Sequence, residues 1–123
     1  MKMEDKRMGH RWDVDTIVNC SLLDSRDVCK VRLLDLSLKG VKISSLNPLL
    51  IGKEVKLFIS IPGEADDVDA WGRVVWDEKV ENNISCGIAF TRIKDADREK
   101  IFSFIDNYFG EELKKRIWWK GIN

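Results

Sequence analysis

Two short segments of the chain combine residue types that bind anions and planar bases. The first is Arg7-Met8-Gly9-His10-Arg11, in which two arginines stand four residues apart around a glycine. Paired guanidinium groups suit bidentate recognition of phosphate or of a guanine edge, and their planes stack on bases. Gly9 lets the backbone turn or approach a ligand closely. The segment therefore favours a site for a ligand with phosphates and bases.

The second segment is Asp35-Leu36-Ser37-Leu38-Lys39-Gly40. The carboxylate of Asp35 is an acceptor for guanine N–H groups, and Ser37 offers a hydroxyl. Gly40 either permits a positive φ angle or removes a side chain that would clash. Each segment alone is a weak signal, because an Asp-x-Ser sequence is common turn chemistry. Their combination in one short chain is much more specific.

Signatures of catalysis are sparse. His10 is the single histidine, and no nucleophile has a recognisable setting around it. Cys20, Cys29 and Cys86 are scattered without CxxC spacing, so we expect all three to pack as small buried hydrophobes. No GxGxxG motif or P-loop is present. These observations favour a protein that is not an enzyme and that holds neither a metal nor a cofactor.

Composition limits the class of protein. The 123 residues suit one domain, and 21 Lys plus Arg balance 21 Asp plus Glu, which argues against a general nucleic-acid-binding protein. Residues 64–81 carry a net charge of −5, which we interpret as a solvated face. Neither a secretory signal nor an apolar run of the ~20 residues needed to span a membrane is visible. We therefore expect a cytoplasmic protein without membrane insertion.

Alternating apolar residues predict six short strands and then a helix. We expect strands within residues 12–22, 29–33, 41–43, 55–61, 70–76 and 84–90. Ile101, Phe104, Ile105 and Tyr108 have the spacing of one helix face, with Asp95 or Asp97 as the cap. We expect Gly110 to end this helix and residues 111–119 to form a second, short one. This order suggests a small antiparallel barrel with a helix packed on it.

The chain resembles the PilZ domain family from about Lys6 to Phe109. The resemblance consists of RxxxR before a strand, DxSxxG some twenty-five residues later, and the closing Cys86-Gly87-Ile88-Ala89-Phe90 stretch before a helix. It implies a mostly β protein, a six-stranded antiparallel PilZ-type β-barrel with a C-terminal α-helix, that acts as a non-catalytic receptor for the bacterial second messenger cyclic di-GMP. In such proteins the arginines grip phosphates and guanine edges and the second motif cradles a guanine. Here these residues are Arg7, Arg11, Asp35, Ser37 and Gly40.

Three other residues are candidates by the same resemblance. Lys6 precedes the first arginine, where a basic residue favours a stacked pair of ligands over one. Trp76 either borders the ligand or packs at the barrel rim, and His10 is either a ligand contact or a plain loop residue. We expect residues 1–12 to form a flexible arm that closes on the ligand and residues 12–123 to form the single barrel domain with its helical tail.

Two other functions remain open at this point. One is a PilZ-fold adaptor that acts by protein contact without nucleotide, for example in pilus or flagellar regulation. The other is a barrel that binds single-stranded nucleic acid through Trp71 and Trp76, against which the zero net charge speaks. The sequence does not identify the downstream protein partner or whether it serves motility or biofilm regulation. Trp118 and Trp119 either cap the barrel or contact that partner.

Overall fold

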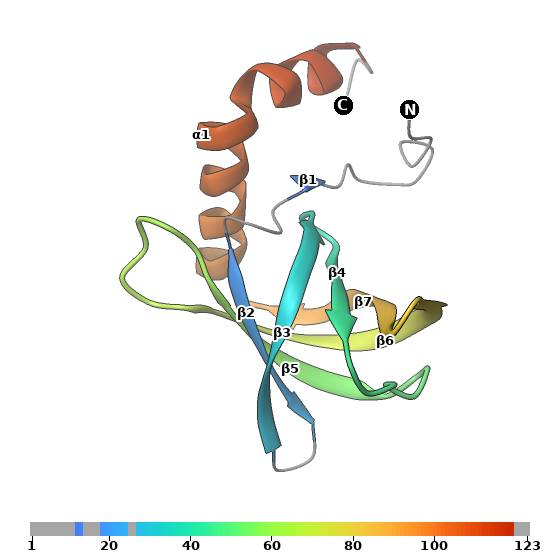
Figure 1. The fold of residues 1–123 in the computed structure, drawn as a ribbon. Coiled ribbons are helices and arrows are strands. Elements are labelled where there is room, and N and C mark those ends of the chain that lie inside the picture. The colour runs from blue at the N-terminus through green and yellow to red at the C-terminus, as the bar shows by residue number, and fades with distance from the viewer. Residues whose placement is uncertain (1–11, 14–17, 25–26, 120–123) are drawn as a thin grey trace.

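The structure is a computed structural model that describes the backbone of residues 12–13, 18–24 and 27–119, and the side chains of residues 18–24 and 27–108. Seven strands precede one helix (Figure 1). They are β1 (Trp12–Asp13), β2 (Asn19–Asp24), β3 (Asp27–Leu36), β4 (Gly40–Ser45), β5 (Glu54–Ser60), β6 (Val68–Val80), β7 (Asn83–Ile93) and α1 (Asp95–Trp119).

Six of the strands close into an antiparallel barrel, as the sequence predicts. Around the barrel the order is β3, β2, β5, β6, β7 and β4, and the pairing of β4 with β3 closes the ring. The two-residue strand β1 lies outside this ring and pairs with the end of β3. The fold is therefore the mostly β barrel with a C-terminal helix that the residue pattern indicates.

The inward faces of the strands form the hydrophobic core. In β5 the side chains of Val55, Leu57 and Ile59 are fully buried, and they alternate with partly exposed residues. β4 contributes Val41 and Ile43 in the same alternating way, because successive side chains point to opposite faces of a sheet. The largest buried side chains are those of Leu22, Leu33, Leu36, Ile43, Leu57, Ile59, Ile88, Ile101 and Ile105.

The first predicted strand is interrupted. Instead of one strand over residues 12–22, β1 and β2 both pair with β3, at Asp35 and at Arg32 respectively. Five residues, 14–18, lie between the two strands where β3 has only two, so the pairing cannot run on in register. Apolar alternation alone does not show such a break, because the period of two continues through it.

The C-terminal segment is a single helix, so the prediction that Gly110 ends the first of two helices is wrong. The backbone of α1 continues through Gly110 to Trp119, and one glycine inside a helix costs only about 0.5–1 kcal/mol relative to alanine. Figure 1 shows α1 running beside the barrel, extending past its end and bending there. In the described part of the chain, no helix is long and apolar enough to cross a membrane.

The first half of α1 packs on the barrel through the predicted face. Ile101, Phe104 and Ile105 are buried, whereas Tyr108 is 53% exposed and contacts the ring of Phe104 at 4.7 Å between centroids. The helix starts at Asp95, and the side chain of Asp97 in the first turn is buried. Acidic residues there suit the positive end of the helix dipole.

Two of the three cysteines lie in the core. Cys20 and Cys86 are buried, and burial raises the pKa of Cys20 to about 12 and also raises the pKa of Cys86. Cys29 is exposed, which corrects the expectation that all three pack inside. The residues of β3 before Arg32 pair with β2 alone, so the β2–β3 hairpin projects from the barrel and carries Cys29 with it.

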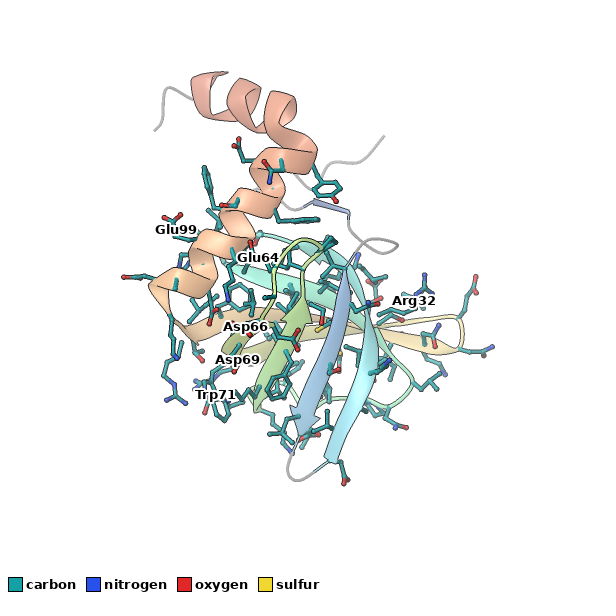
Figure 2. The ribbon with its side chains drawn as sticks, turned by 90° about the vertical axis from the view of Figure 1, so that its left-hand side faces the viewer. Arg32, Glu64, Asp66, Asp69, Trp71 and Glu99 are labelled. Carbon is teal, nitrogen blue, oxygen red and sulfur yellow. The ribbon has the colours of Figure 1, made fainter. Side chains whose placement is uncertain are left out.

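The acidic segment is a solvated face, as expected. Figure 2 shows Glu64 and Asp66 in the β5–β6 connection and Asp69 and Trp71 on the strand that follows, whereas Arg32 lies apart on β3. All of the acidic side chains in residues 64–81 are exposed. The carboxylate of Asp67 accepts a hydrogen bond of 2.7 Å from the hydroxyl of Ser60.

Candidate ligand-binding site

Five residues on five strands stand opposite one another along the outside of the barrel. Cα pairing joins Asp13 to Asp35, Asp35 to Lys42, Lys42 to Gly87 and Gly87 to Trp76. Directly paired residues of antiparallel strands project to the same face of a sheet. We call these five positions the site row. It places two predicted site residues, Asp35 and Trp76, in the same row with Lys42 and Gly87 between them, although they are 41 positions apart in the sequence.

The site row faces outward. Lys42 stands between Val41 and Ile43, both of which are buried in the core, so its own side chain lies on the outer face. It is half-buried, as are Asp35 and Trp76. A carboxylate, an ammonium group and an indole thus share one outer strip of the barrel.

The indole of Trp76 lies over Gly87. A Cβ atom built on Gly87 would collide with Nε1 and Cε2 of that indole. The register of β6 shifts between Val74 and Trp76, which leaves Val75 49% exposed as the extra residue and sets Trp76 opposite the glycine. Tryptophan rings are good stacking surfaces for nucleobases.

The turn between β3 and β4 is built by Ser37. Its Oγ accepts hydrogen bonds from the backbone N–H groups of Lys39 and Gly40, each at 3.1 Å, and its own N–H donates to the Gly40 carbonyl at 3.0 Å. The hydroxyl also donates to that carbonyl at 3.2 Å. Ser37 is 4% exposed. The hydroxyl of Ser37 therefore stabilises the turn, as in other ST-turns.

Gly40 is required by a close approach between strands. It pairs with Ala89 of β7, and a Cβ atom on Gly40 would collide with the carbonyl oxygen of Ile88. Its φ is not among the positive values, which in the described chain belong to Gly52, Gly63 and Glu81. Of the two reasons that the sequence allowed for this glycine, the removal of a clash is the one observed.

Strand β1 contributes Asp13 to the site row, beside Asp35. Trp12 pairs with Leu36 and Asp13 with Asp35, and Arg11 directly precedes Trp12 in the chain. One carboxylate oxygen of Asp35 is shielded from solvent. Figures 1 and 2 both show β1 at the end of the barrel past which α1 extends. The RxxxR segment therefore leads directly to the strand next to DxSxxG.

Several predicted residues fall outside the described part of the chain. These are Lys6, Arg7, His10 and Arg11, whose roles stay predictions. The side chains of Trp118 and Trp119 also lie outside it, although their backbone belongs to α1.

Two residues that the sequence analysis did not single out belong to this region. Lys42 lies in the site row, and the alternation with Val41 and Ile43 could have placed it on the outer face. Arg98 of α1 donates a hydrogen bond of 2.6 Å from Nη1 to the carbonyl of Leu38 in the turn. No pattern signals this contact, because sixty residues separate its two partners.

Trp71 belongs to a different part of the surface. It pairs with Lys56 on one side and with Arg92 on the other, and both cations lie over its ring, at 5.5 Å and 4.9 Å from the centroid. Two cations of its own chain therefore lie near this ring.

The chemistry of the site row is that of binding. It offers an acceptor, a cation and an aromatic surface, and the nearby Ser37 hydroxyl is engaged in the turn. Among the residues that the structure describes, no group of three or more His, Cys, Asp or Glu side chains is placed to hold a metal ion.

Comparison with known proteins agrees with this geometry. The family model described as the PilZ domain matches residues 5–107. No curated protein matches the chain. Among solved structures, the inhibitor of motility MotI/DgrA of Bacillus subtilis is similar, with a TM-score of 0.69 and 15% identity over 89% of this chain and 53% of that one.

Two structures of YcgR from Escherichia coli are also similar, both at 16% identity over 90% of this chain. The complex of YcgR with c-di-GMP has a TM-score of 0.67 and is covered over 49% of its length. The PilZ domain of YcgR with c-di-GMP has a TM-score of 0.65 and is covered over 97%. This chain thus spans about half of MotI/DgrA and of the longer YcgR chain, and nearly all of the isolated domain.

Proposed function

Because the chain belongs to the PilZ domain family, we propose that it is a non-catalytic receptor for cyclic di-GMP that acts in the cytoplasm. The observation that carries the proposal is the site row. It sets the acceptor of DxSxxG, a lysine and a tryptophan on one outer strip, next to the strand that continues the RxxxR segment. Similar proteins solved with c-di-GMP support the choice of ligand.

Each group in the region matches one part of this ligand. Asp35 accepts N–H groups of a guanine, and Trp76 stacks on a base. Lys42 adds a positive charge that attracts the two phosphates, while Arg7 and Arg11 of the arm grip phosphates and guanine edges. Ser37 and Gly40 act by shaping the turn and by letting β4 approach β7. His10 borders the same ligand from the arm, and Lys6 favours a stacked pair.

Signalling then follows from closure of the arm. Residues 1–10 are charged and hold few apolar anchors, so ordering them costs chain entropy that the ligand contacts must offset. The closed state is populated only if it binds the ligand better than the open state does. Amide hydrogen exchange of residues 5–11 with and without cyclic di-GMP tests this step. Equal and rapid exchange in both states would show that the arm does not close.

Isothermal titration calorimetry tests the receptor function itself. We expect heat of binding with cyclic di-GMP, much weaker binding of cyclic AMP and GTP, and a stoichiometry that reports one ligand or a pair. Asp35→Ala should lose affinity, whereas Asp69→Ala, which removes an exposed carboxylate outside the site row, should not. Flat titrations of folded wild-type protein at high micromolar ligand would overturn the proposal. They would favour the adaptor that acts by protein contact alone, with its downstream partner still to be identified.

A further inference from the structure

The turn that carries DxSxxG is fixed from three directions. Its successive carbonyls at Leu38, Lys39 and Gly40 each accept a hydrogen bond. The donor to Gly40 is Ser37 within the turn, at 3.0 Å, and the donor to Lys39 is the N–H of Phe90 on β7, at 2.8 Å. The donor to Leu38 is the guanidinium of Arg98, at 2.6 Å. Of these three bonds, the one to Leu38 connects the turn to the helix.

The part of α1 that carries Arg98 is held in place by its own contacts. It lies in the first turn of α1, where its own N–H donates to the carbonyl of Lys94 at 2.9 Å. Its neighbour Asp97 is buried and lies 3.4 Å from the ammonium of Lys100, and Ile101 is fully buried against the barrel. The start of the helix is thus anchored, while the guanidinium of Arg98 extends outward to a carbonyl of the turn.

The bond joins a charged donor to a neutral acceptor, which makes it stronger than an ordinary hydrogen bond. Arg98 as a whole is exposed, so water competes for its guanidinium. A small movement of either partner can therefore break the bond. A change in the position of Leu38 would lengthen the bond, and a change at the start of α1 would do the same. The side chain of Arg98 therefore links the turn to α1.

We propose that Arg98 is a positioning residue for the ligand site, which holds the DxSxxG turn in its binding geometry and couples that turn to α1. This inference rests on the proposed function and adds the route by which the site row communicates with the helix. Ligand bound at Asp35 favours the geometry of the turn in which Leu38 meets Arg98, and this protects the first turns of α1. By linkage, a helix that holds Arg98 in place favours ligand binding to the same extent.

The test compares Arg98→Gln and Arg98→Lys with wild type, and Arg92→Gln is the matched control. Arg92 is also an exposed arginine near the end of β7, but its guanidinium lies over Trp71 instead of the turn. Calorimetry measures affinity for cyclic di-GMP, hydrogen exchange follows residues 37–40 and 95–105, and thermal melting verifies the fold. Should Arg98→Gln fail to fold, Arg98→Lys provides the comparison.

We expect Arg98→Gln to lose roughly 5-fold in affinity, a moderate value because the bond is exposed, and Arg98→Lys to recover part of it. Without ligand, exchange at the Lys39 and Gly40 amides should accelerate in Arg98→Gln, and the ligand should no longer protect the start of α1. Arg92→Gln should match wild type in all of these. If wild type binds and Arg98→Gln equals it in affinity and exchange, the inference is overturned and the receptor function stands. If wild type does not bind, the proposed function fails, and the ligand-free exchange alone decides whether Arg98 holds the turn.

Discussion

The five-membered ring of the Trp76 indole occupies the space that a side chain on Gly87 would fill. This contact joins β6 to β7 on the outer face of the barrel, in the same cross-strand row as Lys42 and Asp35. The glycine therefore determines where the tryptophan lies. The aromatic surface in this row therefore depends on a position that carries no side chain.

Gly87→Ala should displace Trp76 and weaken ligand binding without unfolding the barrel. The new Cβ collides with the indole, which must rotate away. A stacked base contributes about 1–3 kcal/mol, so we expect a loss of affinity of roughly 5- to 150-fold in calorimetry. Tryptophan fluorescence should change in the free protein as well. Ser85→Ala, two residues away on the same strand, is the control, and unchanged affinity in Gly87→Ala would remove Trp76 from the site.

Arg11→Lys should weaken binding even though the charge is kept. A planar bidentate contact or a stack on a base is a geometry that an ammonium cannot reproduce. A good bidentate pair is worth about 1–3 kcal/mol, or roughly 5- to 150-fold in affinity. Affinity and melting are compared among wild type, Arg11→Lys and Arg11→Ala. If the lysine variant binds like wild type while the alanine variant is weak, Arg11 contributes charge alone. Equal binding by all three places Arg11 outside the site.

Gly40→Ala should destabilise the fold directly. The added methyl group meets the backbone carbonyl of Ile88, which can give way only if β4 moves from β7. Overpacking of this kind costs about 1–3 kcal/mol, and chemical denaturation measures it as a lower free energy of unfolding. Lys39→Ala is the control in the same turn, because Lys39 is exposed and such changes stay within about 0.5 kcal/mol. A Gly40→Ala protein as stable as wild type would show that the strands are not so close.

Stability should fall in alkali because of Cys20. Burial raises the pKa of this thiol from 9.0 to about 12, so between these values the unfolded chain loses a proton that the folded chain keeps. The contribution of Cys20 is therefore complete below pH 9 and declines above it, by at most about 1.4 kcal/mol per pH unit. Denaturation of wild type and Cys20→Val from pH 8 to pH 11 tests this. Parallel pH dependences in the two proteins would assign the alkaline loss to other groups.

Much of the barrel could be predicted because its signals are local. The buried residues Val55, Leu57 and Ile59 alternate with half-buried neighbours in β5, and a period of two directly specifies one inward face. The DxSxxG turn was likewise visible, since Ser37 makes its hydrogen bonds within three residues. The partners of these hydrogen bonds are so close in the sequence that residue type and spacing are enough to predict the turn.

The remaining features depend on contacts between distant segments. Cys29 shares its alternating pattern with core residues, yet it is exposed because its part of β3 pairs with β2 alone. The bulge at Val75 decides which residue of β6 stands opposite Gly87, and nothing near it in the sequence specifies that register. At Gly110 the local signal was misleading. A glycine is typical of a helix end, yet α1 continues through it to Trp119.

The central claim is that cyclic di-GMP binds on the site row, and the most direct test is a two-dimensional amide NMR titration. We predict that the largest shift changes fall on residues 35–42, 76 and 86–89, together with the Trp76 indole N–H. The amide signals of Lys56, Trp71 and Arg92, which contact one another outside the site row, should not shift. Shifts concentrated around Trp71, with residues 35–42 unmoved at saturating ligand, would contradict the account.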